Sequence, residues 1–531
     1  MKNKIIFSEE EEKIFGYIKA LVETLPLQIT PRVVGGWVRD KLLGRKCYDI
    51  DITVDQISGY EFALHVKNFL EKKCNKVYTS QIGVVKKNPD KSKHLETAVL
   101  KIGDFFIDFL SLRTETYTMS RIPRVEIGTL EEDASRRDVT INALYFNLVS
   151  HELEDVLGFG LRDLNERILR TPIDPLKTFN DDPLRLLRIL RFSATLDFEI
   201  SPDVKYVLSN PEIKENINKK VSNERIGIEI QKIMSSDKFY KSIYKIIEND
   251  LFQSITKTNQ ISENFFKTID LNEKIGQKRV DPIKSLNLAK HLNLELKGML
   301  KEENIIIFRY YTILIKTTNV RLGKSFLNTR IAKESFCFTK KMFTRIEKIE
   351  KNLLVLDNLI ENETDEKFLN NKEFENNKLE EISKSPIFYF VKVARILGEE
   401  FIDLSFFIYL LKVACENNIE LIEKEITLKY LLENNYLEEK LKNSESESLK
   451  KLLIVLKFYK NYKSTTLKLF DTKKIIDPEY LTKELGVQKP DIKKILEECN
   501  ILHSIYGENI SSLEIYNLLK ERFTFLSNIT Y

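Results

Sequence analysis

Residues Val33–Asp51 read V-V-G-G-W-V-R-D-K-L-L-G-R-K-C-Y-D-I-D, and this stretch decides which fold the chain adopts. An apolar run, predicted to be a strand, leads into Gly35 and Gly36, and a short helical stretch follows. Asp49 and Asp51 then lie in a second predicted strand, where alternation puts both side chains on one face, about 7 Å apart. Carboxylates beside free backbone N–H groups suit a divalent metal next to a phosphate, which favours phosphoryl or nucleotidyl transfer.

Two further groups of polar residues lie downstream in the same half of the chain. Asp108 is the one acid in the aromatic run Phe105–Leu110, so it is either a third catalytic carboxylate or the partner of a structural ion pair. In Glu131–Leu144, Arg137 can contact phosphate or ribose and Asn142 a sugar hydroxyl, although such charge runs are usually solvated. Binding is favoured here because the run leads directly into an apolar strand.

A basic helix is predicted at Asn180–Phe192, where an acid and a proline mark its first turn. Arg185, Arg188 and Arg191 recur every three residues and fan over one side, which by itself is typical of an ordinary basic face. Asp182 precedes Arg185 by three residues, so an acceptor and a donor lie side by side. Such a pair can accept cytosine and adenine and reject uracil and guanine, which present the reverse pattern.

Composition excludes some classes of protein. The 531 residues suggest three or four domains at about 150 residues each. With 84 Lys and Arg against 80 Asp and Glu, the net charge of +4 does not announce nucleic-acid binding, so any such site must be a local patch. No apolar run is long enough to span a membrane, and the N-terminus resembles neither a secretory nor a transit segment. Five scattered cysteines without a C-x-x-C pair favour a reducing compartment, so we expect the cytoplasm, with nuclear and organellar pools left open.

The pattern of elements predicts an α+β fold: a mixed α/β head followed by helices. Strands are predicted at Arg32–Val34, Ile50–Val54, Glu96–Ile102, Phe105–Leu110 and Leu144–Leu148, and helices from Ser8 and over Tyr60–Lys72. Beyond about residue 164, helical periodicity dominates, including an apolar stripe through Ile226, Ile228, Ile230 and Ile233. Polar breaks lie at 361–384 and at Ser444–Ser448. We predict a catalytic head at 1–150, a base-selecting neck at 151–235, a helical body at 236–375 and a helical tail at 376–531.

The ordered motifs resemble the class II nucleotidyltransferases and the poly(A) polymerase head family, most closely the eukaryotic-type CCA-adding enzymes. The resemblance is dense over about residues 30–235 and faint in the tail around Leu485–Pro490. It rests on Gly35–Asp40, Asp49 and Asp51, Ile107–Tyr117, Arg136–Asp138, Asp155–Gly158, Arg162–Leu164, Asp181–Arg185 and Asn223–Gly227. The chain departs from the family at Asp181, where glutamate is usual, and at Val139, where an aromatic or leucine is usual.

The resemblance implies roles for these residues and a template-independent addition of CCA to the 3′ end of tRNA from CTP and ATP. Asp49 and Asp51 would hold Mg²⁺, with Asp108 as the third catalytic carboxylate. The flexible loop would be Arg113–Arg124, including Arg121. The nucleotide would be bound by Gly35, Gly36, Arg39, Arg137, Asp138, Asn142, Asp182, Arg185, Arg188 and Arg191, with Glu224 and Arg225 bracing the neck.

Three alternatives remain open at this stage. A relative that adds only CC or only A, or a bacterial-type poly(A) polymerase, would share nearly the whole head. From another class, an RNA-binding protein with an inactive polymerase head would be expected to lack Asp49, Asp51 or Arg185, and all three are present.

Overall fold

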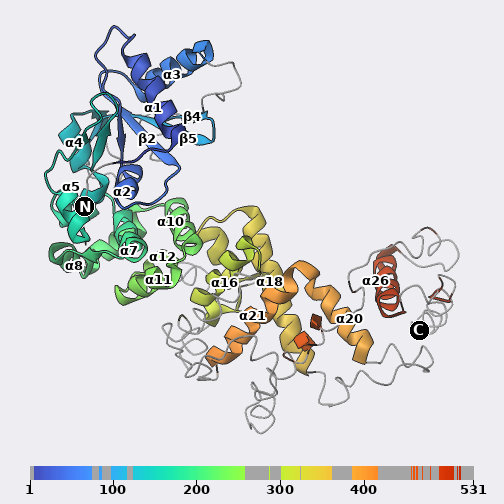
Figure 1. Ribbon diagram of the computed structural model, residues 1–531. Helices are drawn as coiled ribbons and strands as arrows, with labels where there is room; N and C mark the ends of the chain where they lie inside the picture. Colours follow the sequence, from blue (N-terminus) through green and yellow to red (C-terminus); the bar gives the residue numbers. More distant parts are fainter. Residues whose placement is uncertain are drawn as a thin grey trace. The chain divides into compact units, whose positions relative to one another are not determined.

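The computed structural model describes residues 5–73, 83–85, 97–116, 124–256, 300–322, 324–361, 386–416 and 489–506, and a few positions elsewhere: 286, 456, 458–460, 462–463, 469, 479, 511 and 514–515. The chain divides into two compact units, Met1–Thr258 and Asn259–Tyr531, and each is treated by itself (Figure 1). The predicted α+β class is confirmed, because strands lie in the first unit's head and helices dominate thereafter.

A seven-stranded mixed sheet forms the centre of the head, in the order β3-β4-β5-β2-β1-β8-β9. Only β2 and β5 pair in parallel; the other neighbours are antiparallel. Its strands are β1 (Arg32–Val34), β2 (Asp49–Val54), β3 (Gly83–Val85), β4 (Thr97–Ile102), β5 (Phe105–Ser111), β8 (Tyr145–Asn147) and β9 (Leu153–Glu154). A separate hairpin pairs β6 (Arg113–Thr116) with β7 (Arg124–Ile127).

One face of this sheet is buried beneath helix α3 (Gly59–Lys73), which packs on β4 and β5. The Phe62 ring meets that of Phe109 with centroids 5.8 Å apart. Helix and strand approach so closely that a Cβ on Gly59 would lie 2.5 Å from the Phe109 carbonyl oxygen, so only glycine fits there. Because strand side chains alternate, the intervening residues of β5 point to the opposite face, which carries the acids.

Helix α1 (Glu9–Val22) closes the head against helix α2 (Gly36–Leu42). The predicted capping box is confirmed, because Ser8 and Glu11 bond each other's backbone. Glu11 also accepts from Trp37 Nε1 at 2.9 Å, and the Trp37 ring meets Phe15 edge to face. These contacts fix the position of helix α2, and with it the position of the Gly35 turn that directly precedes the helix.

The rest of the first unit is mostly helical, and its colours run from cyan at α4 to green at α12 in Figure 1. After α4 (Leu130–Ser135), the 3₁₀ turn Thr140–Asn142 and α5 (Gly160–Glu166), short strands β10 (Ile168–Leu169) and β11 (Glu199–Ile200) pair in parallel. The neck helices are α6 (Pro175–Asp181), α7 (Leu184–Leu196), α8 (Pro202–Leu208), α9 (Pro211–Lys220), α10 (Asn223–Ser235), α11 (Phe239–Glu248) and α12 (Phe252–Thr256).

The predicted isoleucine stripe is correct at three of its four positions. Ile226, Ile230 and Ile233 are fully buried on α10, but Ile228 is 51% exposed. The prediction is wrong at Ile228 because a residue two places from a buried one faces the opposite side of a helix with 3.6 residues per turn.

In the second unit, the described helices pack around their own apolar core. They are α16 (Glu302–Leu314), α17 (Leu327–Arg330), the π turn Ile331–Ser335, α18 (Lys340–Glu361), α20 (Pro386–Leu397), α21 (Glu399–Glu416) and α26 (Lys489–Tyr506), with a 3₁₀ turn at Ile315–Thr317 and short strands β12 (Arg321–Leu322) and β13 (Ser325–Phe326).

Several sequence predictions fall outside the described residues: Arg121, most of the polar segment 361–384, Ser444–Ser448, and the first part of Leu485–Pro490. Among the described helices, none combines the length and the apolar character that crossing a bilayer requires. The division into four domains stays a prediction.

Candidate active site

Three carboxylates lie on the face of the sheet opposite helix α3, on β2 and β5, the two strands of this sheet that pair in parallel. The register sets Asp51 opposite Asp108 and Asp49 opposite Phe106. Paired residues of neighbouring strands point to the same face, so Asp49, Asp51 and Asp108 share it. Asp49 is exposed, whereas Asp51 and Asp108 are half-buried.

The electrostatics of these acids are unfavourable for negative charge. Burial, followed by the charges of Asp108 and Asp49, raises the pKa of Asp51 to about 6. Burial and the charge of Asp49 also raise the pKa of Asp108. Mutually repelling carboxylates of this kind are typical of sites completed by a cation.

The donors present suit a hard divalent cation, which prefers carboxylate oxygens. Among the described residues, no three or more His, Cys, Asp or Glu side chains converge closely enough to hold a metal by themselves. Mg²⁺ is commonly bound by one or two carboxylates together with substrate phosphates, and Asp49 and Asp51 fit that arrangement.

The glycine turn lies directly beside Asp51. Gly35 has φ +79°, a conformation that side chains rarely adopt, and it precedes α2. A Cβ at Gly35 would lie 3.7 Å from Asp51 Oδ2 and 3.6 Å from Arg137 Nη1. The turn therefore brings backbone, carboxylate and guanidinium to one place, with Gly36 as the first residue of the helix.

Arg137 is held by a buried acid that sequence reasoning did not select. Asp133 accepts from Arg137 Nη2 at 2.8 Å and from the Tyr145 hydroxyl at 2.7 Å, and also pairs with Arg136. Burial opposes ionisation of Asp133, but the two arginines and Tyr145 hold its pKa well below the usual range. Arg137 is thus oriented with Nη1, which also donates to the Asn142 carbonyl at 3.4 Å, beside Gly35.

Arg39 and Asn142 lie in a buried hydrogen-bond chain. Arg39 Nη1 donates to Asn142 Oδ1 at 2.7 Å, while its other nitrogens bond Asp40. Asn142 Nδ2 in turn donates to Asp138 Oδ1 at 3.0 Å. These side chains are therefore engaged with one another, and Asn142 links helix α2 to the polar cluster that follows α4.

The hydrogen-bonded network of Arg39, Asn142 and Asp138 continues from the head into the neck through side chains of α7. Arg188 Nε donates to Asp138 Oδ2 at 2.7 Å, and Glu229 of α10 pairs with both Arg188 and Arg191. Burial would raise the pKa of Asp138, but Arg188 and Asn142 hold it well below its ordinary value. The predicted nucleotide residues Asp138, Arg188 and Arg191 therefore also tie the neck to the head.

The predicted base-selecting pair lies at the start of α7, where the Arg185 backbone N–H donates to the Asp182 carbonyl at 3.1 Å and each side chain bonds other residues. Arg225 of α10 donates to both Asp182 oxygens, at 3.1 and 2.7 Å. Burial opposes the charge on Asp182, yet Arg225 and then Arg185 lower its pKa. Arg185 Nη2 donates to the Arg136 carbonyl at 2.5 Å. The orientation of each side chain is thus set by a residue other than its predicted partner, Arg225 for Asp182 and Arg136 for Arg185.

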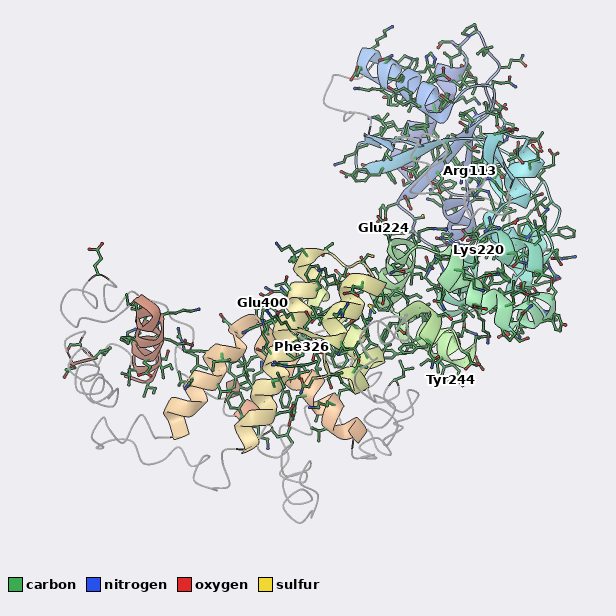
Figure 2. All side chains as sticks on the ribbon, turned by 180° about the vertical axis from the view of Figure 1, so that it is seen from behind. Arg113, Lys220, Glu224, Tyr244, Phe326 and Glu400 are labelled. Atoms are coloured by element: carbon green, nitrogen blue, oxygen red, sulfur yellow. The ribbon has the colours of Figure 1, made fainter. Side chains whose placement is uncertain are left out.

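The predicted flexible loop begins and ends in a hairpin. Arg113 opens β6 opposite Ile127, and Thr116 pairs with Arg124 of β7, while Arg121 lies outside the described residues. The Arg113 carbonyl accepts from Arg136 Nε at 3.1 Å, which joins the base of the hairpin to the Asp133 cluster. Figure 2 labels Arg113 on the head, and Lys220 and Glu224 on the neck.

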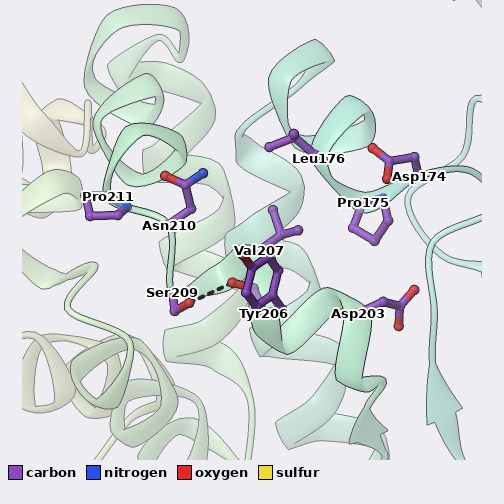
Figure 3. A pocket seen from close by; sticks show the side chains of 9 residues that line it. All are labelled: Asp174, Pro175, Leu176, Asp203, Tyr206, Val207, Ser209, Asn210 and Pro211. Atoms are coloured by element: carbon purple, nitrogen blue, oxygen red, sulfur yellow. Dashed lines mark hydrogen bonds between the residues drawn. The ribbon is translucent and has the colours of Figure 1, made fainter.

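A separate hollow of about 610 Å³ opens in the neck (Figure 3). Its lining includes Asp174, Tyr206 and Pro211, and the Ser209 hydroxyl donates to the Tyr206 carbonyl at 2.7 Å. None of the predicted site residues lines it, so it contributes nothing to the carboxylate site.

Sequence reasoning missed Asp133, Tyr145 and Glu229, and it treated Arg225 only as a brace. Asp133 and Glu229 are almost fully buried acids on helices. In the sequence, each is an acid at helical spacing from apolar residues. A single sequence does not distinguish such a buried acid from one on the solvent-exposed face of the helix.

Comparison with known proteins places this geometry in context. Residues 31–170 match the family model described as the poly A polymerase head domain. The mitochondrial CCA tRNA nucleotidyltransferase of Saccharomyces cerevisiae is 46% identical over 198 residues, which cover 37% of this chain and 36% of that protein. A tRNA nucleotidyltransferase of Schizosaccharomyces pombe is 39% identical over 230 residues, 41% of this chain and 48% of the relative. The matched part thus spans less than half of these curated relatives.

The fold likeness extends further than the sequence likeness. The crystal structure of the Bacillus stearothermophilus CCA-adding enzyme in complex with CTP aligns over 98% of this chain and 100% of its own, with a TM-score of 0.58 and 15% identity. At that identity the alignment shows a shared fold, and the chemistry must be argued from the site.

Proposed function

We propose that this chain, whose residues 31–170 form a poly A polymerase head domain, adds CCA to the 3′ end of tRNA from CTP and ATP by nucleotidyl transfer. The observation that carries the proposal is the meeting of Asp51 and Arg137 Nη1 beside the Gly35 turn. Carboxylates for a metal, a guanidinium for phosphate and a side-chain-free turn are what a nucleoside triphosphate site requires. The names of the curated relatives supply the substrate.

In this proposal, the triphosphate lies along the glycine turn between Arg39 and Arg137. Asp133 and Tyr145 hold the Arg137 plane, so its remaining terminal nitrogen is preorganised and little side-chain entropy is lost on binding. Asp40 and Asn142 do the same for Arg39. Asp108, beside Asp51, is placed to accept the proton of the attacking 3′-hydroxyl, and its raised pKa suits a base.

Asp49 and Asp51 would hold Mg²⁺, which when bound activates the hydroxyl and neutralises charge at the α-phosphate. Donor chemistry supports this cofactor, because the shared face supplies the carboxylate oxygens that Mg²⁺ prefers. The raised pKa of Asp51 supports it too, since a cation would relieve the repulsion.

Base selection falls to Asp182 and Arg185 at the start of α7. A carboxylate has about four acceptor sites, so Asp182 can bind Arg225 and still accept from the amino group of cytosine or adenine. Arg185 would donate to the neighbouring ring nitrogen. A wrong base leaves both groups unpaired, which penalises UTP and GTP.

We further propose tRNA as the partner of the helical second unit, bound through phosphates and shape. The S. cerevisiae relative is named mitochondrial, which supports an organellar pool beside a cytoplasmic one. Fractionation of cells that express the tagged chain tests the compartment.

The direct test uses purified protein, Mg²⁺ and tRNA transcripts that end before CCA, after C and after CC. Each transcript receives CTP, ATP, UTP or GTP alone, then CTP with ATP, and products are sized to one nucleotide. Addition of two C and one A, then arrest, is the expected result. Omission of the metal with EDTA should stop all addition.

Other outcomes would select the alternatives. Addition of C alone would make the chain a CC-adding enzyme, and A only on the CC end an A-adding enzyme. Long A tails would identify a poly(A) polymerase. Intact tRNA binding without any extension would show an inactive head.

A further inference from the structure

The open face of the sheet extends beyond the carboxylates onto β5 and β4. Along β5, Phe105, Ile107 and Phe109 are buried beneath α3, whereas Phe106 is 57% exposed. Register places Phe106 opposite Asp49 on one side and opposite Lys101 on the other. An exposed phenylalanine and a lysine thus lie on the catalytic face, next to the acids.

The order of the strands places the Gly35 turn and Phe106 on opposite sides of β2. From β2, which carries Asp49 and Asp51, the sheet continues through β1 to the Gly35 turn in one direction, and through β5 to β4 in the other. Arg137 lies on the Gly35 side. Phe106 and Lys101 therefore lie on the side away from the turn.

Nucleotidyl transfer is a displacement in which the attacking and leaving oxygens lie roughly in line. The proposed function puts the pyrophosphate at the Gly35 turn. The 3′-hydroxyl must then approach the α-phosphate from the opposite side, which is the side of β5. The last nucleotide of the RNA arrives where Phe106 and Lys101 lie.

We infer that Phe106 and Lys101 form the seat of the terminal nucleotide of the RNA to be extended. The base stacks on the Phe106 ring, and the Lys101 ammonium, 5.6 Å from the ring centroid, lies beside its phosphate. Stacking accepts every base, as required of a seat that holds the last base of the tRNA before the first addition and cytosine before the next two. This inference rests on the proposed function for the direction of attack.

Other exposed aromatic side chains do not meet the same conditions. Tyr48 precedes β2 and packs against Phe105, whose ring is on the buried face. Phe159, 43% exposed, forms a similar pair with Arg162 at 5.2 Å, but it precedes α5 and is not on the strands that carry the acids. Phe159 is therefore a matched control.

The test compares two RNAs by fluorescence anisotropy, without nucleotide: a tRNA transcript that ends in CC, and the same transcript shortened by three nucleotides at that end. The difference in their affinities reports contact with the terminal nucleotides alone. The wild type should favour the longer RNA, and Phe106→Ala should remove about 5- to 100-fold of that preference. Phe106→Trp and Phe159→Ala should keep it.

Kinetics supply the second readout. Phe106→Ala should raise the KM for the CC-ending transcript and leave the KM for ATP unchanged. The inference is overturned if Phe106→Ala keeps the full preference, or if the KM for ATP rises instead. A wild type that adds CCA without preferring the longer RNA would overturn the inference alone. A wild type that shows the preference but makes no product would overturn the proposed function alone.

Discussion

At the scale of residues, the carboxylate face combines one exposed acid with two half-buried ones. The pKa of Asp51 is raised to about 6 by burial and by its acidic neighbours, so charge on it costs folding free energy at neutral pH. A bound cation would offset this cost. We therefore expect substitution of the half-buried acid Asp51 to change stability, and substitution of the exposed acid Asp49 to change catalysis alone.

Asp51→Asn should stabilise the metal-free protein. An acid with a raised pKa binds its proton more readily when folded, so stability falls as pH rises from about 4 to about 6 and stays low above that. The substitution should raise the Tm in EDTA at pH 7.5 by at least about 2 °C, and hardly at all at pH 4. Thermal unfolding measures it, with exposed Asp104→Asn as control; equal shifts at both pH values would contradict the electrostatic cause.

Asp49→Ala should abolish the addition of both C and A and leave tRNA affinity nearly unchanged. The exposed carboxylate makes no contribution to the apolar core, so its loss removes a metal ligand without unfolding the head. Single-turnover extension and anisotropy on the same preparation give the two readouts. Near-normal turnover would exclude Asp49 as a metal ligand.

At the scale of elements, helix α7 does two things at once. Arg185 lies in its first turn, just after Asp182, while Arg188 and Arg191 join Asp138 of the head to Glu229 of α10. Ten of its residues are buried, so the helix cannot shift without disturbing the neck core. The proposed base-selecting pair is therefore held in place by packing as well as by hydrogen bonds.

Arg225→Met should relax discrimination against UTP and GTP more than it slows addition of C. Without the two Arg225 bonds, Asp182 loses its fixed orientation, although it still carries the acceptor oxygens. Misincorporation ratios by product sizing give the measurement. Lys219→Met, which breaks the exposed Lys219–Glu215 pair on α9, is the control. A uniform loss of rate with unchanged selectivity would count against a positioning role.

At the scale of the whole molecule, each unit has its own core, and that of the second is organised around a buried acid. Glu350 of α18 is fully buried and accepts from the Tyr311 hydroxyl at 2.9 Å, from Asn328 Nδ2 at 2.8 Å and from the Asn319 backbone at 2.8 Å. One carboxylate thereby joins three separate segments of the unit.

Glu350→Ala should destabilise the second unit and spare the first. Three donors lose this acceptor, and those of Tyr311 and Asn328 are buried, which costs about 2 kcal/mol or more. Calorimetry should show one transition moved to lower temperature, while CTP binding to the first unit is retained. Glu347→Ala, on the same helix but in a partly exposed pair with Lys351, should change little. Loss of CTP binding together with the transition would show that the two units are not independent.

Each of the five strands predicted from the sequence lies within one residue of an observed strand at both ends, because alternation and glycine punctuation are local signals. The strand predicted at Arg32–Val34 matches β1, and that at Ile50–Val54 begins one residue late. The strands β3, β6, β7 and β10 to β13, which have two to four residues each, were not predicted. The short strand β9 was not predicted, because two residues carry too little pattern. The error at Ile228 has a different origin, because helical spacing itself places a residue two positions from Ile226 on the opposite side of the helix.

The sequence alone determined which chemistry is present: two acids one residue apart in a strand, a glycine turn before them, and an acid–arginine pair at the start of a helix. These are local relations set by the covalent order of residues. The tertiary structure decided which groups meet. Only the register of β2 and β5 sets Asp108 beside Asp51, and only the packing of α10 on α7 brings Arg225 to Asp182 across 43 residues. Such pairings depend on hydrogen-bond ladders and burial between distant segments, so no local pattern carries them.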